Sequence, residues 1–169
     1  MEIRVARPDE YAAAGELVVD AYRRLPDAAQ TAAYEPRLRD VAGRAAVATV
    51  LVAVGDGGRL LGSVTYVAQP GPLAESGGDD DAHIRMLAVA PAAQGGGVGR
   101  RLVEACVERA AATGKRRIVL KTRRSMTTAH RLYERLGFRR EPSLDREGTV
   151  VQLIGYSLEI SGTQAASPD

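Results

Sequence analysis

The stretch HIRMLAVAPAAQGGGVGRRL, residues 83–102, most constrains how this chain of 169 residues can fold. Residues 84–89 form a short apolar run with β-branched ends, which predicts a buried strand. Pro91 has no N–H for a sheet ladder, so the strand should end before it. Beyond the loop, apolar residues recur every fourth position, at Val98, Leu102, Cys106 and Ala110. That spacing, with charged residues between, predicts an amphipathic helix.

The loop between this strand and this helix is rich in glycine. Glycines let a backbone approach a ligand closely, and the unpaired N–H groups of a first helical turn attract anions, so the arrangement suits a phosphate. A Walker-type loop is excluded because no Lys-Ser or Lys-Thr follows the glycines. A dinucleotide loop is excluded because Leu102 stands where a third glycine is needed. The remaining pattern is Gln-x-x-Gly-x-Gly, residues 94–99. A tight strand-to-helix turn is the alternative interpretation.

The composition is that of an ordinary globular protein, with 45% hydrophobic and 26% charged residues. We expect a single domain over residues 1–160 and a flexible C-terminal tail over residues 161–169. No apolar run is long enough to span a bilayer, and the first residues lack a signal-peptide core. The single cysteine, Cys106, excludes an internal disulfide and lies on the apolar stripe of its helix. We therefore predict a cytoplasmic protein with no metal site and no membrane partner, as a monomer or homodimer.

Positive charge is concentrated in one half of the chain. The net charge is only +2, yet residues 100–140 carry 13 Lys and Arg residues against three acidic ones. This asymmetry predicts an anionic partner. Nucleic acid is disfavoured because aromatic residues make up only 4% of the chain and no nucleic-acid-binding module is recognisable. A phosphate-rich cofactor beside the glycine loop fits better, and a compositional habit of Arg-rich sequences is the alternative.

The rest of the chain alternates strand and helix patterns. Further strands are expected over residues 2–7, 49–54, 59–68, 116–122 and 149–160, and further helices over residues 8–22, 27–46 and 129–136. The Asp56-Gly57 turn predicts a hairpin between the second and third strands. The helical segment 27–46 carries Pro36, so a break is expected near that residue. The loop 69–81 ends in Asp79-Asp80-Asp81, which either attracts a cationic amine or is a solvated linker.

The order strand, helix, strand over residues 84–122 indicates a βαβ unit. Its two strands should lie parallel, with the glycine loop at the carboxyl end of the first, where open α/β sheets bind ligands. A second motif, AHRLYERLGF, follows at residues 129–138. Its apolar residues share one helix face, Gly137 suits the left-handed position after the helix, and Phe138 is placed to pack back on Tyr133.

Together the two motifs resemble the GNAT superfamily of N-acetyltransferases. The loop motif follows Leu-Ala-Val-x-Pro, as in that family's pyrophosphate loop, and the second motif is similar to its Ala-x-x-Leu-Tyr-Glu-x-Leu-Gly-Phe signature. The resemblance is strong over residues 83–138. It implies an α/β (α+β) fold with a mixed, mostly antiparallel sheet of six to seven strands, a splayed central parallel pair and about four flanking helices.

The resemblance further implies acetyl-CoA as the cosubstrate. Its pantetheine arm would enter between the two parallel strands and pair with the backbone of Leu87 and Val89, and its pyrophosphate would sit on the amides from Gly95 to Arg100. The implied cofactor-binding residues are Leu87, Ala88, Val89, Gln94, Gly95, Gly96, Gly97, Val98, Gly99 and Arg100. An acceptor amine would attack the thioester directly, without an acyl-enzyme.

Three chemical tasks remain for such an enzyme. The amine must be neutral, which favours a base; His83 stands where the family often has a glutamate, and histidine titrates near neutrality. The thioester oxygen needs a donor, which a backbone N–H near Val89 can supply. The departing thiolate needs a proton, and Tyr133 matches the family's tyrosine general acid. Alternatively His83 is a solvent-facing strand residue and Tyr133 a core aromatic.

One position departs from the family pattern. Met126 stands where members often have an asparagine that contacts the cofactor arm, and Ser125 or Thr127 could substitute. The predicted function is transfer of an acetyl group to a primary amine of an acceptor whose identity the sequence does not reveal. The alternative is an acyl-CoA-binding sensor without turnover.

Overall fold

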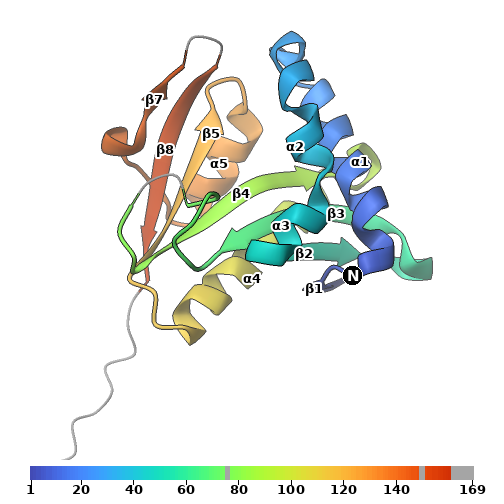
Figure 1. Ribbon diagram of the computed structural model, residues 1–169, viewed down its shortest axis with the longest axis horizontal. Coiled ribbons are helices and arrows are strands. Elements are labelled where there is room, and N and C mark those ends of the chain that lie inside the picture. Colours follow the sequence, from blue (N-terminus) through green and yellow to red (C-terminus); the bar gives the residue numbers. More distant parts are fainter. Residues whose placement is uncertain (75–76, 149–150, 161–169) are drawn as a thin grey trace, which may run out of the picture.

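One mixed sheet organises the structure, a computed structural model that describes residues 1–74, 77–148 and 151–160 (Figure 1). Its strands are β1 (Glu2–Val5), β2 (Thr49–Val54), β3 (Leu60–Val67), β4 (Asp81–Val89), β5 (Arg117–Arg123), β6 (Arg139–Arg140), β7 (Arg146–Glu147) and β8 (Gln152–Glu159). The α-helices are α1 (Tyr11–Arg23), α2 (Glu35–Arg39), α3 (Val41–Val47), α4 (Val98–Ala112) and α5 (Thr127–Arg135).

The strand order is β1-β2-β3-β4-β5-β8-β6, with β7 also paired to β8. Every pairing is antiparallel except that of β4 with β5, which is parallel. Apolar side chains of α4 and α5 pack on one face of the sheet, and those of α1, α2 and α3 pack on the other. The predicted fold class is thus confirmed. The described residues form eight strands instead of six or seven because β6 and β7 are two-residue strands with no sequence pattern of their own.

The sequence predicted two turns correctly, the hairpin at Asp56-Gly57 and the end of α5 at Gly137. The hairpin between β2 and β3 turns at Asp56, and Gly57 there has φ +70°, which a residue with a side chain rarely adopts. Gly137 follows α5 with φ +90°, as the second motif predicted. Phe138 then packs on Tyr133, with ring centroids 5.7 Å apart. These contacts fix the end of α5 against the core.

The segment over residues 27–46 differs from the prediction. It forms two short 3-10 turns, Ala28–Gln30 and Ala32–Tyr34, and then α2 and α3. The segment is interrupted near Pro36, as expected, but Pro36 itself lies in the first turn of α2, where its missing N–H costs no hydrogen bond. The break comes at Asp40, whose φ and ψ are −75° and 69° and whose carboxylate accepts from the Gly43 N–H to start α3.

The central strands separate at a β-bulge in β4. Arg85 lies opposite Thr65 of β3 and Ala88 lies opposite Ser63, so β4 has one extra residue between those pairs. Met86, in that interval, has φ +53°, a rare value for a residue with a side chain. The ladder between β4 and β5 ends at the Ile84–Leu120 pair. Beyond it the two strands diverge, as the resemblance implied.

Two expectations concern the ends of the chain and membranes. The tail predicted over residues 161–169 lies outside the described residues, as do the first two residues of the strand predicted over 149–160. Within the part of the chain that the structure describes, no helix is both long and apolar enough to cross a bilayer.

Candidate active site

A cleft of about 920 Å³ opens where the C-terminal half of β4 meets the glycine loop. We call it the loop cleft; its walls are the end of α1, residues 87–100 and residues 125–136. Of the ten residues implied to bind the cofactor, those that line it are Leu87, Ala88, Val89, Gln94, Gly95, Gly97, Val98, Gly99 and Arg100. Gly96 does not line it, and the Gly96 N–H instead donates to the Ala93 carbonyl at 3.3 Å.

The loop presents a row of unpaired amide donors. None of the described residues accepts a hydrogen bond from the backbone N–H of Gly95, Gly97, Val98, Gly99 or Arg100. The helical ladder of α4 begins only at Arg101, whose N–H donates to the Gly97 carbonyl at 3.1 Å. Free amides at a helix N-terminus favour an anion through their N–H groups and the helix dipole.

Two glycines beside the cleft have different structural roles. Gly97 immediately precedes α4 with φ +78°, a left-handed conformation that strains any residue with a side chain. At Gly99, an added Cβ atom would lie 3.2 Å from Leu132 of α5 and 3.5 Å from Val89 of β4. The absence of a side chain there lets α4, α5 and β4 converge on the cleft.

Four arginines add positive charge to the loop cleft: Arg24, Arg100, Arg131 and Arg135. Arg100 is exposed and its Nε donates to Glu104 at 2.7 Å, an exposed pair that contributes little stability. Arg101, the neighbouring arginine, does not line the cleft. Donor amides, glycines and guanidinium groups together fit a ligand with several phosphate oxygens, which is the chemistry of coenzyme A.

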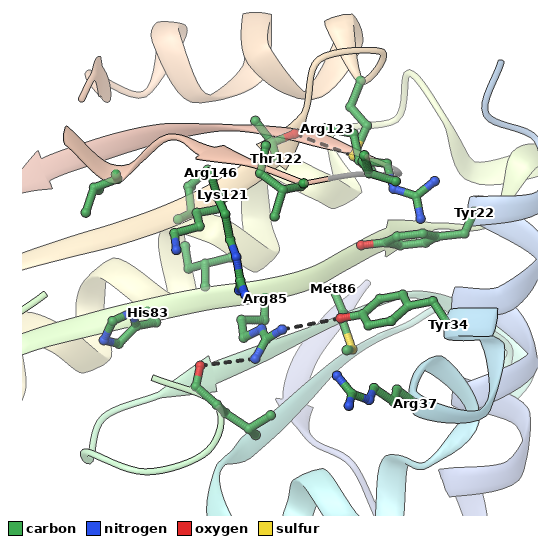
Figure 2. A pocket seen from close by; sticks show the side chains of 18 of the residues that line it. Tyr22, Tyr34, Arg37, His83, Arg85, Met86, Lys121, Thr122, Arg123 and Arg146 are labelled. Atoms are coloured by element: carbon green, nitrogen blue, oxygen red, sulfur yellow. Dashed lines mark hydrogen bonds between the residues drawn. The ribbon is translucent and has the colours of Figure 1, made fainter. Parts of the chain in front are cut away.

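A second cleft, of about 540 Å³, opens between α1–α2 and the strands β4, β5 and β7. We call it the basic cleft because five cationic side chains line it: Arg37, Arg85, Lys121, Arg123 and Arg146. Figure 2 shows Arg146 pointing toward Arg85, with Lys121 beside Arg146 and with Tyr22 and Tyr34 on the opposite side. Arg85 donates to the Tyr34 hydroxyl at 3.3 Å and to the Leu73 carbonyl at 3.2 Å.

The two clefts meet at Met126. This residue lines both of them and immediately precedes α5. Its sulfur accepts a long hydrogen bond, 3.5 Å, from the Thr122 hydroxyl. Ser125, a suggested substitute for the family asparagine, lines the loop cleft but donates its hydroxyl to Asp27 at 3.0 Å. Thr127 also lines that cleft.

His83 lies in the basic cleft, at the end opposite the two tyrosines (Figure 2). It is only 7% exposed, so the solvent-facing alternative is wrong. Burial lowers the pKa of its imidazole below the ordinary value of 6.5; Asp81 opposes this, and Arg85, Lys121 and Lys115 add to it. His83 is consequently neutral at pH 7 and able to accept a proton.

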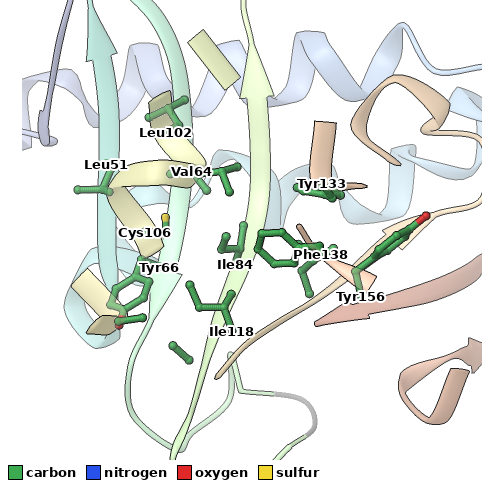
Figure 3. Close-up of a cluster of buried hydrophobic side chains, with 14 of the residues drawn as sticks. Leu51, Val64, Tyr66, Ile84, Leu102, Cys106, Ile118, Tyr133, Phe138 and Tyr156 are labelled. Carbon is green, nitrogen blue, oxygen red and sulfur yellow. The ribbon is translucent and has the colours of Figure 1, made fainter. Parts of the chain in front are cut away.

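Tyr133 lies in the core between α5 and the sheet (Figure 3). It is 5% exposed, and its ring packs against those of Phe138 and Tyr156, the latter with centroids 6.0 Å apart. It lines neither cleft, although the neighbouring Leu132 lines the loop cleft. Burial raises the pKa of its phenol, and the Tyr22 phenol adds to the rise. Tyr133 therefore keeps its proton at neutral pH.

Asp81, the last residue of Asp79-Asp80-Asp81, is not available to attract an amine. Asp81 is the first residue of β4 and is 3% exposed. Its carboxylate accepts from Arg117 in a bidentate pair at 3.0 Å and from the Gly78 N–H at 2.8 Å. These bonds tie the start of β4 to β5, so Asp81 has a structural role.

Sequence reasoning missed most of the basic cleft. Tyr22 and Tyr34 come from α1 and the turn before α2, with ring centroids 6.4 Å apart, and nothing in the sequence indicates that they meet. A signal did exist for the cations. Lys121 and Arg123 are two residues apart in β5, so they share one face of that strand.

A model of the acetyltransferase (GNAT) family matches residues 14–138 of the chain. The chain belongs to the GNAT family of acetyltransferases. It is thus an acetyl-CoA-dependent acyltransferase, as its two motifs indicated. The family match does not define the acceptor.

Solved structures agree with this assignment. The chain is similar to YncA of Salmonella typhimurium, a protein described as a putative acetyltransferase and solved with its cofactor acetyl-CoA; identity is 25% over 100% of this chain and 98% of that one, with a TM-score of 0.69. A GCN5-related N-acetyltransferase from Kribbella flavida is 27% identical over 94% and 96%, with a TM-score of 0.70. The ribosomal-protein-S18-alanine N-acetyltransferase of Escherichia coli, at 20% identity over 99% of both chains and a TM-score of 0.70, shares the fold. No curated protein matches the sequence.

Proposed function

We propose that this protein transfers an acetyl group from acetyl-CoA in the loop cleft directly to a primary amine held in the basic cleft. The observation that carries the proposal is the junction of the two clefts at Met126, beside the separated ends of β4 and β5. A cosubstrate and an acceptor bound in adjoining clefts can be brought into contact without a covalent enzyme intermediate. Proximity of this kind accounts for much of the rate gain of two-substrate enzymes.

The loop cleft supplies what acetyl-CoA needs. In this proposal the unpaired amides of Gly95, Gly97, Val98, Gly99 and Arg100 hold the pyrophosphate. The remaining implied residues are Gln94 and Gly96, which belong to the loop, and Ala88, which belongs to β4 beside it. The backbone of Leu87 and Val89 lies beyond Ile84, the last residue of β4 that pairs with β5, and is assigned to the pantetheine arm.

Proton traffic is assigned to two residues. The reaction moves the acetyl group from sulfur to nitrogen, so the amine loses one proton and the departing sulfur gains one. His83, neutral and in the basic cleft, is assigned as the base that takes the proton from the amine, directly or through water. Tyr133, protonated at neutral pH, is assigned as the acid. It lines neither cleft but directly follows Leu132 of the loop cleft, so its role requires that its hydroxyl reach the sulfur from behind that wall.

Thiol release with a panel of primary amines tests the activity itself. The enzyme should bind acetyl-CoA and release free CoA only when a competent amine is present. The sensor alternative is favoured by the enclosure of Tyr133 and by Met126 in place of the family asparagine. Binding of acetyl-CoA with no thiol release for any amine in the panel would favour the sensor.

The variant Tyr133→Phe tests the acid. The fold should survive, because the ring still packs on Phe138 and Tyr156 and no described residue hydrogen-bonds the hydroxyl that is lost. Turnover with a competent amine should fall by roughly 10²–10⁴, the usual contribution of a positioned acid. Acetyl-CoA affinity should change by only a few fold, since one neutral hydrogen bond contributes about 1 kcal/mol.

A matched control is Tyr156→Phe, which removes a neighbouring hydroxyl that donates to Glu134 instead. It should leave turnover close to wild type. Full activity in Tyr133→Phe would remove the acid role and leave Tyr133 as a core aromatic. The single-domain organisation over residues 1–160, the cytoplasmic location and the monomer or homodimer state also stay predictions.

A further inference from the structure

The charge of the basic cleft restricts which amines can bind there. Five cationic side chains line it, and none of its lining residues among those the structure describes is Asp or Glu. A polyamine or another purely cationic amine would therefore meet repulsion from several sides. An amine that also carries an anionic group would be attracted.

The cations come from opposite walls of the cleft. Lys121 and Arg123 project from β5 and Arg146 from β7, whereas Arg37 belongs to α2 on the other wall (Figure 2). Arg123 is held in place: its Nη1 donates to the Thr31 hydroxyl at 3.0 Å, and its guanidinium lies 5.1 Å from the centre of the Tyr22 ring. Its charge is partly neutralised by Asp27, 3.5 Å away.

Lys121 and Arg37 have no such neutralisation. No described residue pairs with the ammonium group of Lys121 or with the guanidinium group of Arg37, and both line the cleft. Lys121 directly follows Leu120, the last residue of β5 that pairs with β4. Lys121 therefore belongs to the part of β5 where the two strands begin to separate.

The remaining lining favours an apolar body of moderate size. Tyr22 and Tyr34 form an aromatic corner, and burial raises the pKa of Tyr22 to about 12, so its phenol stays uncharged. Apolar side chains of Leu73, Met86 and Leu153 complete the wall. The cleft thus combines aromatic and apolar surface with the positive charges of Lys121 and Arg37.

We infer that the acceptor is a small primary amine that carries a carboxylate and an apolar side chain, as a free amino acid does. This inference rests on the proposed function and specifies its acceptor class. The carboxylate binds the cations of the cleft, with Lys121 and Arg37 as its unpaired partners. The same cations disfavour the ammonium form of the acceptor, which helps to supply the neutral amine that the transfer requires.

Matched acceptors test the inference. Phenylalanine, phenylalaninamide, phenethylamine and spermidine are compared by thiol release, with each kcat/KM expressed per neutral amine. Phenylalaninamide keeps the ring and the amine of phenylalanine but lacks the negative charge. We expect kcat/KM for phenylalanine to exceed that for its amide by roughly 10- to 100-fold, the range of a charge-assisted hydrogen bond. Spermidine should be the poorest acceptor.

Variants assign the preference to the cleft. Lys121→Met and Arg37→Met should each raise KM for phenylalanine about tenfold or more and leave phenethylamine nearly unchanged. The control is Arg124→Met, which removes an exposed arginine beside Arg123 that lines neither cleft. All three variants should keep the thermal shift produced by acetyl-CoA, which separates loss of the acceptor site from loss of the fold.

Three results would overturn the inference. One is a kcat/KM for phenylalaninamide, phenethylamine or spermidine that equals or exceeds the kcat/KM for phenylalanine. Another is a preference for acidic peptides over free amino acids, which would replace the small acceptor by a protein. The third is an enzyme that does not acetylate phenylalanine when supplied with acetyl-CoA and, when loaded with CoA, does not bind phenylalanine by calorimetry. If no amine releases thiol but phenylalanine still binds more tightly than its amide, the proposed acetyl transfer is refuted. The preference of the basic cleft for an amine with a carboxylate is then still supported.

Discussion

Gly97→Asp is the perturbation that most directly tests the loop cleft. In the wild type, acetyl-CoA at a hundredfold excess over its Kd should stabilise the protein by about 2.7 kcal/mol through mass action. For a chain of this size, each kcal/mol raises Tm by about 2–4 °C, so the expected shift is about 5–10 °C. A carboxylate at Gly97 would lie among the free amides of Val98, Gly99 and Arg100 and compete with phosphate for them. The shift should therefore disappear.

The control for this variant is Gly97→Ala. With φ +78° at this position, any side chain is strained by about 1–2 kcal/mol, so both variants should have a lower Tm without ligand. Only the aspartate adds charge to the amides. Differential scanning fluorimetry at several acetyl-CoA concentrations should thus show the ligand-induced shift in Gly97→Ala and none in Gly97→Asp.

Two outcomes would refute this reasoning. A wild-type shift in Gly97→Asp would mean that the amides of the loop do not hold the phosphates. An unchanged melting curve for the wild type at millimolar acetyl-CoA would contradict the loop cleft as the cosubstrate site altogether.

Three other predictions follow from the same geometry. By calorimetry, Arg100→Ala should weaken CoA binding severalfold and Arg101→Ala should not, because only Arg100 lines the loop cleft. Binding of the protein to duplex DNA should be weak and lost at moderate salt. In His83→Gln, kcat/KM expressed per neutral amine should lose the decline that wild type shows as pH falls below 6.5, since burial, opposed by Asp81, lowers the pKa of His83 and only neutral imidazole accepts a proton. Asp81→Asn should cost about 3 kcal/mol in urea unfolding at pH 7. Burial alone would raise the pKa of Asp81, but Arg117 lowers it overall, so this stabilisation is present above pH 3.8 and lost as pH falls through the lower folded value.

The fold was predictable where local chemistry and long-range packing agree. The parallel pair follows from two apolar runs separated by one amphipathic helix, and the hairpin follows from Asp56-Gly57. The loop cleft follows as well, since strand end, glycines and helix start are contiguous in the chain. Nine of the ten implied cofactor residues line that cleft for this reason.

Other features could not be predicted because they depend on contacts between distant segments. The bulge at Met86 has no sequence signal, since the residue is neither glycine nor asparagine and its left-handed conformation is imposed by the surrounding sheet. The burial of Asp81 depends on Arg117, 36 residues later. The start of α5 is another such feature: Met126 occupies the N-cap, with no side-chain hydrogen bond, and Ser125 donates to Asp27, a residue 98 positions earlier.

The positive charge of residues 100–140 shows how one cluster in sequence becomes two sites in space. A helix repeats every 3.6 residues, so Arg131 and Arg135, four apart in α5, share a face and both line the loop cleft. A strand repeats every two residues, so Lys121 and Arg123 share a face of β5, and both line the basic cleft. The cluster that predicted an anionic partner from its summed charge therefore lines two separate clefts. The two periods divide the same cluster between a cosubstrate with phosphates and, by the inference above, an acceptor with a carboxylate.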